Sequence, residues 1–225
     1  MAVDAGPRAQ FCENFAVFPS VLLQRVLARP ALMTLRDRYG EIMRRYDDAG
    51  GDALNRMSRA DLQTYLARLL TKQDQMSMAA SIESRVPFLD HVLVEFASAL
   101  PDVCKLSGLT TKRILRDAMK TMLPASILNR PKMGFPVPLN GWLRGRWNAV
   151  ASDVLLDRRS RERGVIDPKA VELLLRDHAS GRANGTDRLW SLLNLELWFR
   201  TFIDKQGVQT LAAPLPVQAD AYSVA

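Results

Sequence analysis

The sequence predicts an all-α protein, and three observations lead to that prediction. Apolar residues recur at three- and four-residue steps through most of the chain. Proline and glycine stand between these periodic segments, where helices end. No stretch shows the apolar–polar alternation that indicates a strand. We therefore expect helices joined by short connections, and no strand.

The composition is that of an ordinary globular protein of 225 residues, with 48% hydrophobic and 24% charged residues. No apolar run approaches the roughly 20 residues that a membrane-spanning helix needs. The first residues also lack the pattern of a signal peptide. Cys12 and Cys104 are far apart in the chain, and with only two histidines they suggest neither a disulfide framework nor a metal site. We expect a cytoplasmic protein with no membrane partner and no metal ligands.

The net charge of +7 permits a polyanionic partner, either a nucleic acid or a nucleoside triphosphate. Basic residues are, however, spread through the chain with acids close by. The densest basic cluster, residues 157–163, carries two acids of its own and is interpreted as a solvated loop. We do not expect nucleic-acid binding, because the sequence contains no recognised binding motif.

The periodic segments divide the chain into three parts. Residues 1–19 form a poorly defined N-terminal segment, residues 20–204 a helical domain, and residues 205–225 a tail that is expected to be disordered. In order, the helices expected in the domain are a short one from Ser20 ended by Pro30, then Ala31–Asp47, residues 54–69, the first part of residues 74–90, the run from Asp90 to Pro101, Lys112–Met122, a short turn from Pro124, Trp147–Leu156, Pro168 to Gly181, and a last helix from Asp187.

Several helix starts carry specific signals. Asp90 stands before an apolar run, in the place of an N-cap. Asp167 followed by Pro168 combines a capping residue with proline at the first helical position. Thr110 or Thr111 can cap the helix that follows them.

Residues 129–145 interrupt the helical pattern. They contain three prolines and three glycines among several large apolar residues. We expect a loop that is not helical and that packs over a core edge or over a ligand, with packing favoured.

The last helix is apolar nearly all round, which predicts a central place in the core. Within it Glu196 and Arg200 are four residues apart in the order that favours an ion pair. We interpret them as a structural pair and not as catalysts.

The stretch from Asp74 to Asp90 has the features of a site. It begins as a helix of small residues, and Pro87 then forces an extended connector. Side chains alternate along an extended segment, so Glu83 and Arg85 share one face. This arrangement suits the binding of a small polar molecule, or alternatively a buried salt bridge that pins one helix to the next. The residues alone favour the salt bridge, because structural ion pairs are common.

Five ordered blocks connect the chain to a known family. They are TYLARLLTKQDQMSMAASIESRVPFLDH, LVEFASALP, TKRILRDAM, LPASILNRPKMGFPVPL and RLWSLLNLELWFR. They lie within residues from about Asp61 to Phe202, a range that closely resembles the C-terminal part of glutamine-dependent asparagine synthetases. Each block is weak by itself, and their order makes the signal specific.

The resemblance implies an ATP-dependent amidoligase that uses ATP and Mg²⁺. In that family aspartate is activated as an acyl-adenylate with loss of pyrophosphate, and glutamine-derived ammonia then attacks the acyl carbon. The resemblance also implies that the helices are the C-terminal portion of an α/β adenine-nucleotide alpha-hydrolase-like, PP-loop synthetase domain, whose sheet-forming half is absent here.

The resemblance assigns roles to four residues. Lys112 matches the lysine that this family and its β-lactam synthetase relatives place against the reacting phosphate and carboxylate. Its position just inside a helix start agrees with that role, although position alone favours a solvated first-turn lysine. Asp74, Glu83 and Arg85 match the block that borders the nucleotide and substrate pocket. We expect them to bind or to shape the pocket, without transferring protons.

Two motifs of the family do not occur in the sequence: the Ser-Gly-Gly-x-Asp-Ser phosphate loop and the Gly-Glu-Gly-x-Asp-Glu-type loop that supplies magnesium ligands. Residue 2 is Ala, where the complete enzymes begin with a catalytic cysteine. We therefore expect an incomplete enzyme that is inactive alone and that would partner the missing glutaminase and phosphate-loop half. The alternatives are a non-catalytic helical interaction module and an amidoligase acting on another carboxylate.

Overall fold

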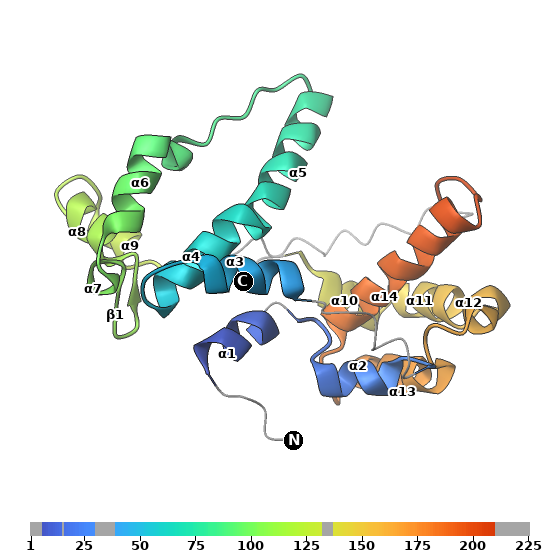
Figure 1. The fold of residues 1–225 in the computed structure, drawn as a ribbon. Coiled ribbons are helices and arrows are strands. Elements are labelled where there is room, and N and C mark those ends of the chain that lie inside the picture. Colours follow the sequence, from blue (N-terminus) through green and yellow to red (C-terminus); the bar gives the residue numbers. More distant parts are fainter. Residues whose placement is uncertain (1–5, 15, 30–38, 132–136, 210–225) are drawn as a thin grey trace. The chain divides into compact units, whose positions relative to one another are not determined.

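The computed structural model describes residues 6–14, 16–29, 39–131 and 137–209 of the chain (Figure 1). The described part is mostly helical, in agreement with the sequence. The chain divides into two compact units. Unit 1 comprises Met1–Phe15 and Asp37–Met133, and unit 2 comprises Ala16–Arg36 and Gly134–Ala225. The domain boundaries at residues 19 and 204 stay a prediction.

Unit 1 contains helices, a 3-10 turn and one short hairpin. In chain order its elements are α1 (Pro7–Asn14), α3 (Gly40–Asp48), α4 (Ala53–Gln63), α5 (Tyr65–Ala79), the 3-10 turn η2 (Pro87–Leu89), α6 (His91–Ala99), α7 (Asp102–Lys105), β1 (Leu106–Ser107), β2 (Thr110–Thr111), α8 (Arg113–Met119) and α9 (Ala125–Leu128).

The core of unit 1 lies where α1, α3 and α4 meet. Its buried side chains are Phe11, Cys12, Met43, Tyr46 and Ala60. The rings of Phe11 and Tyr46 stack with their centroids 5.7 Å apart. Asp52 caps α4 by accepting a hydrogen bond from the Asn55 backbone N–H at 3.0 Å. This core therefore uses the N-terminal helices of the unit.

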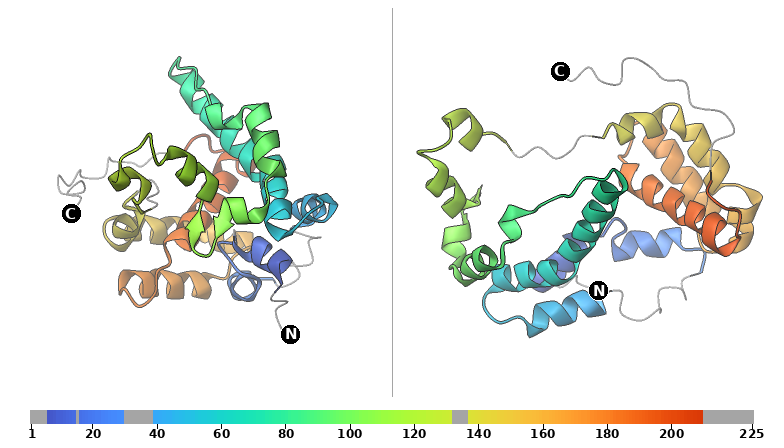
Figure 2. Two further views of the ribbon diagram at one scale, coloured as in Figure 1. Left: turned by 90° about the vertical axis from the view of Figure 1, so that its left-hand side faces the viewer. Right: turned by 90° about the horizontal axis from the view of Figure 1, so that it is seen from above.

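Helices α5 to α9 contribute no fully buried side chain in the part of the chain that the structure describes. They and their connections nevertheless carry many exposed apolar side chains, which we call the apolar surface of unit 1. Its members are Tyr65, Leu69, Met76, Met78, Ile82, Val86, Phe88, Val92, Leu93, Phe96, Val103, Leu106, Leu109, Ile114, Leu115, Met122, Leu123 and Ile127. Figures 1 and 2 show α5 extending from α4 and joined to α6 by an extended segment.

The hairpin of β1 and β2 contradicts the prediction that the chain has no strand. The strands pair antiparallel, with Leu106 opposite Thr111 and Ser107 opposite Thr110, around a turn in which Gly108 has a φ of 57°. Each strand has two residues, too few for an alternating pattern to be recognised. Thr110 and Thr111 are strand residues and do not cap the next helix.

Unit 2 is built from helices and ends in a π-helical segment. In chain order its elements are α2 (Ser20–Val26), α10 (Leu139–Arg144), α11 (Trp147–Leu155), α12 (Arg158–Arg163), α13 (Pro168–Ala179), α14 (Thr186–Trp198) and the π-helical segment η3 (Phe199–Ile203).

The core of unit 2 is formed by α10, α11, α13 and α14, which lie together in Figures 1 and 2. Its buried side chains are Leu143, Ala151, Leu155, Val171, Leu175, Leu189, Leu192 and Leu193. Helix α2 is joined to this core by backbone hydrogen bonds from Ala28 N to Val165 O at 3.0 Å and from Asp167 N to Val26 O at 2.8 Å. The last helix is central to this core, as predicted, although its outer face carries exposed Trp190.

Two of the predicted caps, those at Asp90 and Asp167, are confirmed. The Asp90 carboxylate accepts a hydrogen bond from the Leu93 backbone N–H at 3.1 Å at the start of α6. The Asp167 carboxylate accepts one from the Lys169 backbone N–H at 2.9 Å, with Pro168 as the first residue of α13.

Two segments predicted as loops contain helices. Helix α10 lies inside residues 129–145. It can form because all three prolines precede it, and burial of the Leu143 side chain stabilises it. Helix α12 lies inside the basic cluster, where the Asp157 side chain accepts from the Arg159 backbone N–H and Gly164, at a φ of 64°, ends the helix. Each of these helices has only six residues, which is too short for a helical period to be recognised in the sequence.

Other predictions concern residues outside the described ranges. These are the part of the predicted helix Ala31–Asp47 before residue 39, and the predicted disordered tail beyond residue 209. Within the described ranges, no helix combines the length and the apolar character needed to cross a membrane.

His178 is buried at the C-terminal end of α13, with none of its surface exposed. Its Nδ1 accepts a hydrogen bond at 3.2 Å from the backbone N–H of Gly185, the N-cap residue of α14. Burial lowers the pKa of His178, and the charge of Arg144 lowers it further. Hydrogen bonds to the backbone of Asn140 and Ala183 raise the pKa and so oppose this shift. The imidazole is therefore neutral in the folded unit and joins the ends of two helices.

We predict that the chain loses stability as the pH falls from 7 through the ordinary histidine pKa of 6.5. The folded-state pKa is the lower one, so the unfolded chain binds the proton first, at a cost of about 1.4 kcal/mol per unit of pKa difference. His178→Asn, which keeps an acceptor and does not titrate, should flatten the dependence measured by urea unfolding. His91→Asn, at the exposed start of α6, is the control, and this variant should retain the pH dependence of stability. Equal slopes in the wild type and His178→Asn would contradict the prediction.

Candidate functional site

The connector between α5 and η2, residues 82–86, is extended because both of its ends are forced out of helical geometry. Ser81 follows the end of α5 with a φ of 57°. At the other end Pro87 excludes Val86 from helical geometry, and Val86 has φ −122° and ψ 75°. The Gln73 side chain on α5 donates a hydrogen bond to the Ser84 hydroxyl at 3.1 Å, which ties the connector to the helix before it.

Glu83 and Arg85 form an ion pair on one side of this connector, with 2.5 Å between a guanidinium nitrogen and a carboxylate oxygen. The pairing agrees with the predicted shared face. The side chains are 68% and 82% exposed, so the pair is not the buried salt bridge that the residues alone favoured. An exposed pair contributes about 0–1 kcal/mol, too little to hold two helices together. Both charges remain accessible to a ligand.

Asp74 lies on α5, ahead of the connector, with its side chain exposed. Its backbone carbonyl accepts a hydrogen bond from the Ser77 hydroxyl at 3.1 Å. Among the described residues, none donates a hydrogen bond to its carboxylate. Like Glu83 and Arg85, Asp74 is displayed at the surface of unit 1.

Lys112 occupies the junction between β2 and α8. It is the N-cap residue of α8 and has left-handed backbone geometry, with φ 54° and ψ 37°. This places it one residue before the helix, whereas the sequence predicted it just inside. A residue other than glycine in this geometry costs about 1–2 kcal/mol. Its ammonium is exposed and has no hydrogen-bond or ion-pair partner within the described residues.

The hairpin that carries Lys112 is attached to the rest of unit 1 through Lys105. The Lys105 ammonium donates hydrogen bonds to the Asn55 side-chain oxygen on α4 and, at 3.3 Å, to the Ser98 backbone carbonyl on α6. Burial raises the pKa of nearby Asp102, and the Asp52 carboxylate raises it further, while Lys105 opposes them. The base of the hairpin is thus fixed by contacts with two helices.

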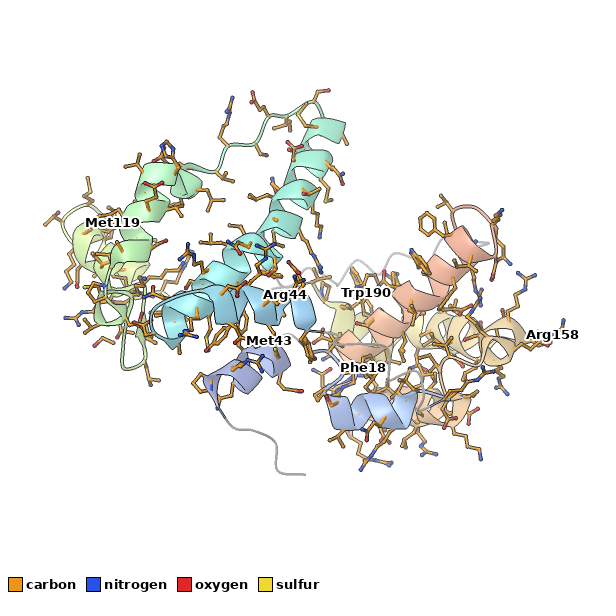
Figure 3. All side chains as sticks on the ribbon, viewed as in Figure 1. Phe18, Met43, Arg44, Met119, Arg158 and Trp190 are labelled. Carbon is orange, nitrogen blue, oxygen red and sulfur yellow. The ribbon has the colours of Figure 1, made fainter. Side chains whose placement is uncertain are left out.

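The structure places the predicted residues at two separate places in unit 1. Glu83 and Arg85 precede α6, and Lys112 follows it, so the connector and the hairpin lie at opposite ends of this helix (Figure 1). No hydrogen bond or ion pair between described residues joins Lys112 to Asp74, Glu83 or Arg85. Figure 3 shows the side chains of the connector projecting away from the ribbon. The described residues of unit 1 therefore display the charges without enclosing a pocket around them.

The described residues contain no cluster of metal-binding side chains. They contain no group of three or more histidine, cysteine, aspartate or glutamate side chains that could hold a metal ion.

Arg116 was not predicted as a site residue, although it lies next to Lys112. It stands four residues later, and its Nε donates a hydrogen bond to the Thr111 carbonyl at 3.1 Å. The four-residue spacing within the block TKRILRDAM is the signal that could have revealed it.

A second charged cluster lies in unit 2. The predicted pair is confirmed, with Arg200 Nε 3.0 Å from a Glu196 carboxylate oxygen. Arg163 adds two hydrogen bonds of 3.1 Å to the same carboxylate and two of 3.1 and 2.8 Å to Asp204. Arg200 also reaches Asp157 at 2.9 Å. The sequence did not reveal Arg163, because 33 residues separate it from Glu196.

This cluster is a structural clamp. Glu196 is buried, and both of its carboxylate oxygens accept hydrogen bonds from arginine. The guanidinium of Arg163 lies 4.6 Å from the centre of the Phe199 ring and lowers the pKa of Asp204 by hydrogen bonding. The mutual pairing of these buried and partly buried charges supports the structural interpretation.

Comparison with known proteins gives a consistent result. The family model for asparagine synthase matches residues 9–200. A Mycobacterium tuberculosis (strain H37Rv) protein, named provisionally as a glutamine-hydrolyzing asparagine synthetase, is 38% identical over 175 residues, which cover 76% of this chain and 26% of that protein. The glutamine-hydrolyzing asparagine synthetases 1 and 3 of Bacillus subtilis (strain 168) are 36% and 44% identical over 68% and 61% of this chain, and 24% of each relative.

The chain thus spans about a quarter of the length of the curated relatives it matches. No solved structure matches it significantly.

We predict that Lys112→Gly gives a more stable α8 than Lys112→Ala, by about 1 kcal/mol, because only glycine is unstrained in left-handed geometry. Amide hydrogen exchange of α8 measures this local free energy. Lys120, the C-cap residue of α8, has ordinary helical geometry and provides the control. There glycine should be the less stable substitution, by about 0.5–1 kcal/mol. A less stable α8 in Lys112→Gly than in Lys112→Ala would contradict the assigned backbone geometry.

Proposed function

The chain belongs to the asparagine synthase family, and from this membership we propose that it is a portion of an ATP-dependent, glutamine-hydrolysing asparagine synthetase. The reaction converts aspartate, ATP and glutamine-derived ammonia into asparagine, AMP and pyrophosphate through an acyl-adenylate. The observation that carries the proposal is the family match over residues 9–200, within which Lys112 presents an exposed ammonium.

Lys112 is the proposed catalytic residue. An ammonium beside the reacting phosphate and carboxylate opposes the negative charge that develops there, and such electrostatic stabilisation is worth about 10²–10³ in rate. Asp74, Glu83 and Arg85 are proposed to border the nucleotide and substrate pocket. Their exposure supports a binding role, because ionised side chains at the surface remain free to contact a polar ligand.

The proposed enzyme needs ATP and Mg²⁺, and this chain supplies only part of their site. The sequence lacks the family's phosphate loop, and the described residues contain no group of three or more histidine, cysteine, aspartate or glutamate side chains that could hold a metal ion. We therefore propose that the chain is inactive alone, and that polyphosphate and magnesium are held by the phosphate-loop half of the synthetase. A cytoplasmic location belongs to the same proposal.

The apolar surface of unit 1 supports a partner for the chain. Soluble proteins rarely leave contiguous apolar patches larger than a few hundred Å² exposed. In α/β domains, helices of this kind cover a sheet with their apolar side. We propose that α5 to α9 form the helical layer of a PP-loop synthetase domain and cover its sheet-forming half, with the glutaminase beyond it. The relatives, about four times as long as the matched segment, have the length to include such parts.

Two alternatives remain as proposals. A non-catalytic interaction module would use the same apolar surface, and would not depend on Lys112. An amidoligase for another carboxylate would depend on Lys112 and would prefer another acid over aspartate.

The test is pyrophosphate release from ATP that depends on aspartate. We predict none from the isolated chain, and activity from a chimera in which this chain replaces the matching segment of Bacillus subtilis asparagine synthetase 1. Lys112→Ala should lower kcat of the chimera by about 10²-fold, with partial recovery in Lys112→Arg. Lys120→Ala, which removes the ammonium at the other end of α8, is the matched control and should leave kcat unchanged.

Turnover by the isolated chain would overturn the claim of an incomplete site. An active chimera that is indifferent to Lys112→Ala would favour the interaction module. Release that depends on a different carboxylic acid would identify the other amidoligase.

A further inference from the structure

We infer that Arg116 is a positioning residue, which fixes the left-handed backbone of Lys112 and thereby the direction of its ammonium. The effect on catalysis rests on the proposed function of Lys112. The restraint of the Lys112 backbone rests on the hydrogen-bond geometry alone.

The backbone of Lys112 is defined by two peptide planes, one on each side of its Cα, and its φ and ψ are the rotations between them. Arg116 bonds both planes. Its side-chain Nε donates to the Thr111 carbonyl at 3.1 Å, which holds the plane before Lys112. Its backbone N–H donates to the Lys112 carbonyl at 3.0 Å, which holds the plane after it. One residue therefore restrains both rotations.

Arg116 is itself anchored. A terminal guanidinium nitrogen donates to the Leu128 carbonyl at the end of α9. That carbonyl belongs to the last turn of the helix, where backbone acceptors have no partner within the helix. Arginine suits this position because its planar fork offers donors in fixed directions to two acceptors at once. The half-buried guanidinium thus links the hairpin, α8 and α9.

Restraint of this kind is what a left-handed lysine requires. Such a conformation is strained and persists only where surrounding contacts over-determine it. The strand pairing of Thr111 with Leu106 fixes the chain just before Lys112. The Arg116 side chain restrains the peptide plane between Thr111 and Lys112. Without Arg116, the plane before Lys112 would lose its side-chain restraint, and the residue could relax to the right-handed region, which would turn its side chain.

The test uses the isotopically labelled 225-residue chain and the intraresidue NOE between HN and Hα, which is strong only where φ is positive. We expect a strong NOE at Lys112 in the wild type, and its loss in Arg116→Gln. Arg113→Gln is the matched control. Arg113 lies in the same turn and donates to the Val103 carbonyl at 3.4 Å, not to a plane beside Lys112. Ser81, with a φ of 57° in the same unit, is the internal reference and should keep its NOE in both variants.

Retention of the strong NOE at Lys112 in a folded Arg116→Gln chain would overturn the inference. If Ser81 also loses its NOE, the Arg116→Gln variant has unfolded. The NOE at Lys112 is then measured in Arg116→Lys, and its retention in that folded variant would overturn the inference. Lysine retains the charge and lacks the fork.

In the chimera, Arg116→Gln should lower kcat by about tenfold or more, as misplacement of a catalytic group does, with the KM for ATP nearly unchanged. If Lys112 loses its NOE in Arg116→Gln while Lys112→Ala leaves the chimera fully active, the positioning inference holds and the proposed role of Lys112 fails. The two failures are thus distinguishable.

Discussion

The constraint that governs this chain is the need to bury apolar side chains, and its two units meet it differently. Unit 2 packs its leucines between four helices. Unit 1 buries a small cluster under α1, α3 and α4, and leaves the apolar side chains of α5 to α9 at its surface. Each large side chain left exposed forgoes about 1.5–3 kcal/mol of burial free energy. The exposed set is the basis of the proposal that another protein segment covers this surface.

The charged groups of the two units also differ in exposure, and the difference agrees with the roles proposed for them. In unit 2, Glu196 is buried, and it is paired with the partly buried Arg163 and Arg200. In unit 1, Glu83, Arg85 and Lys112 are exposed, and Lys112 is held in a strained backbone conformation. Backbone strain of this kind clusters at active sites and ligand clamps, which agrees with the role proposed for Lys112.

The sequence was sufficient for several interactions between residues close together in the chain. The caps at Asp90 and Asp167 and the pair of Glu196 with Arg200 follow from neighbours within four residues. It failed where the elements are very short, as in the hairpin and α10, and where the partner is distant in sequence, as for Arg163 with Glu196. The resemblance to a family singled out Lys112, but the left-handed geometry at this residue depends on Arg116 and α9, which periodicity does not reveal.

The central claim is that the apolar surface of unit 1 is an interface for the remainder of a synthetase. Amide hydrogen exchange tests it most directly, with the isolated chain compared with the same chain inside the Bacillus subtilis chimera. We predict slower exchange in α5, α6 and α8 within the chimera, and unchanged exchange in α11, α13 and α14. Equal exchange in α5, α6 and α8 in both proteins would contradict it. Protection that already appears in the isolated chain as its concentration rises would show that a second copy covers this surface instead.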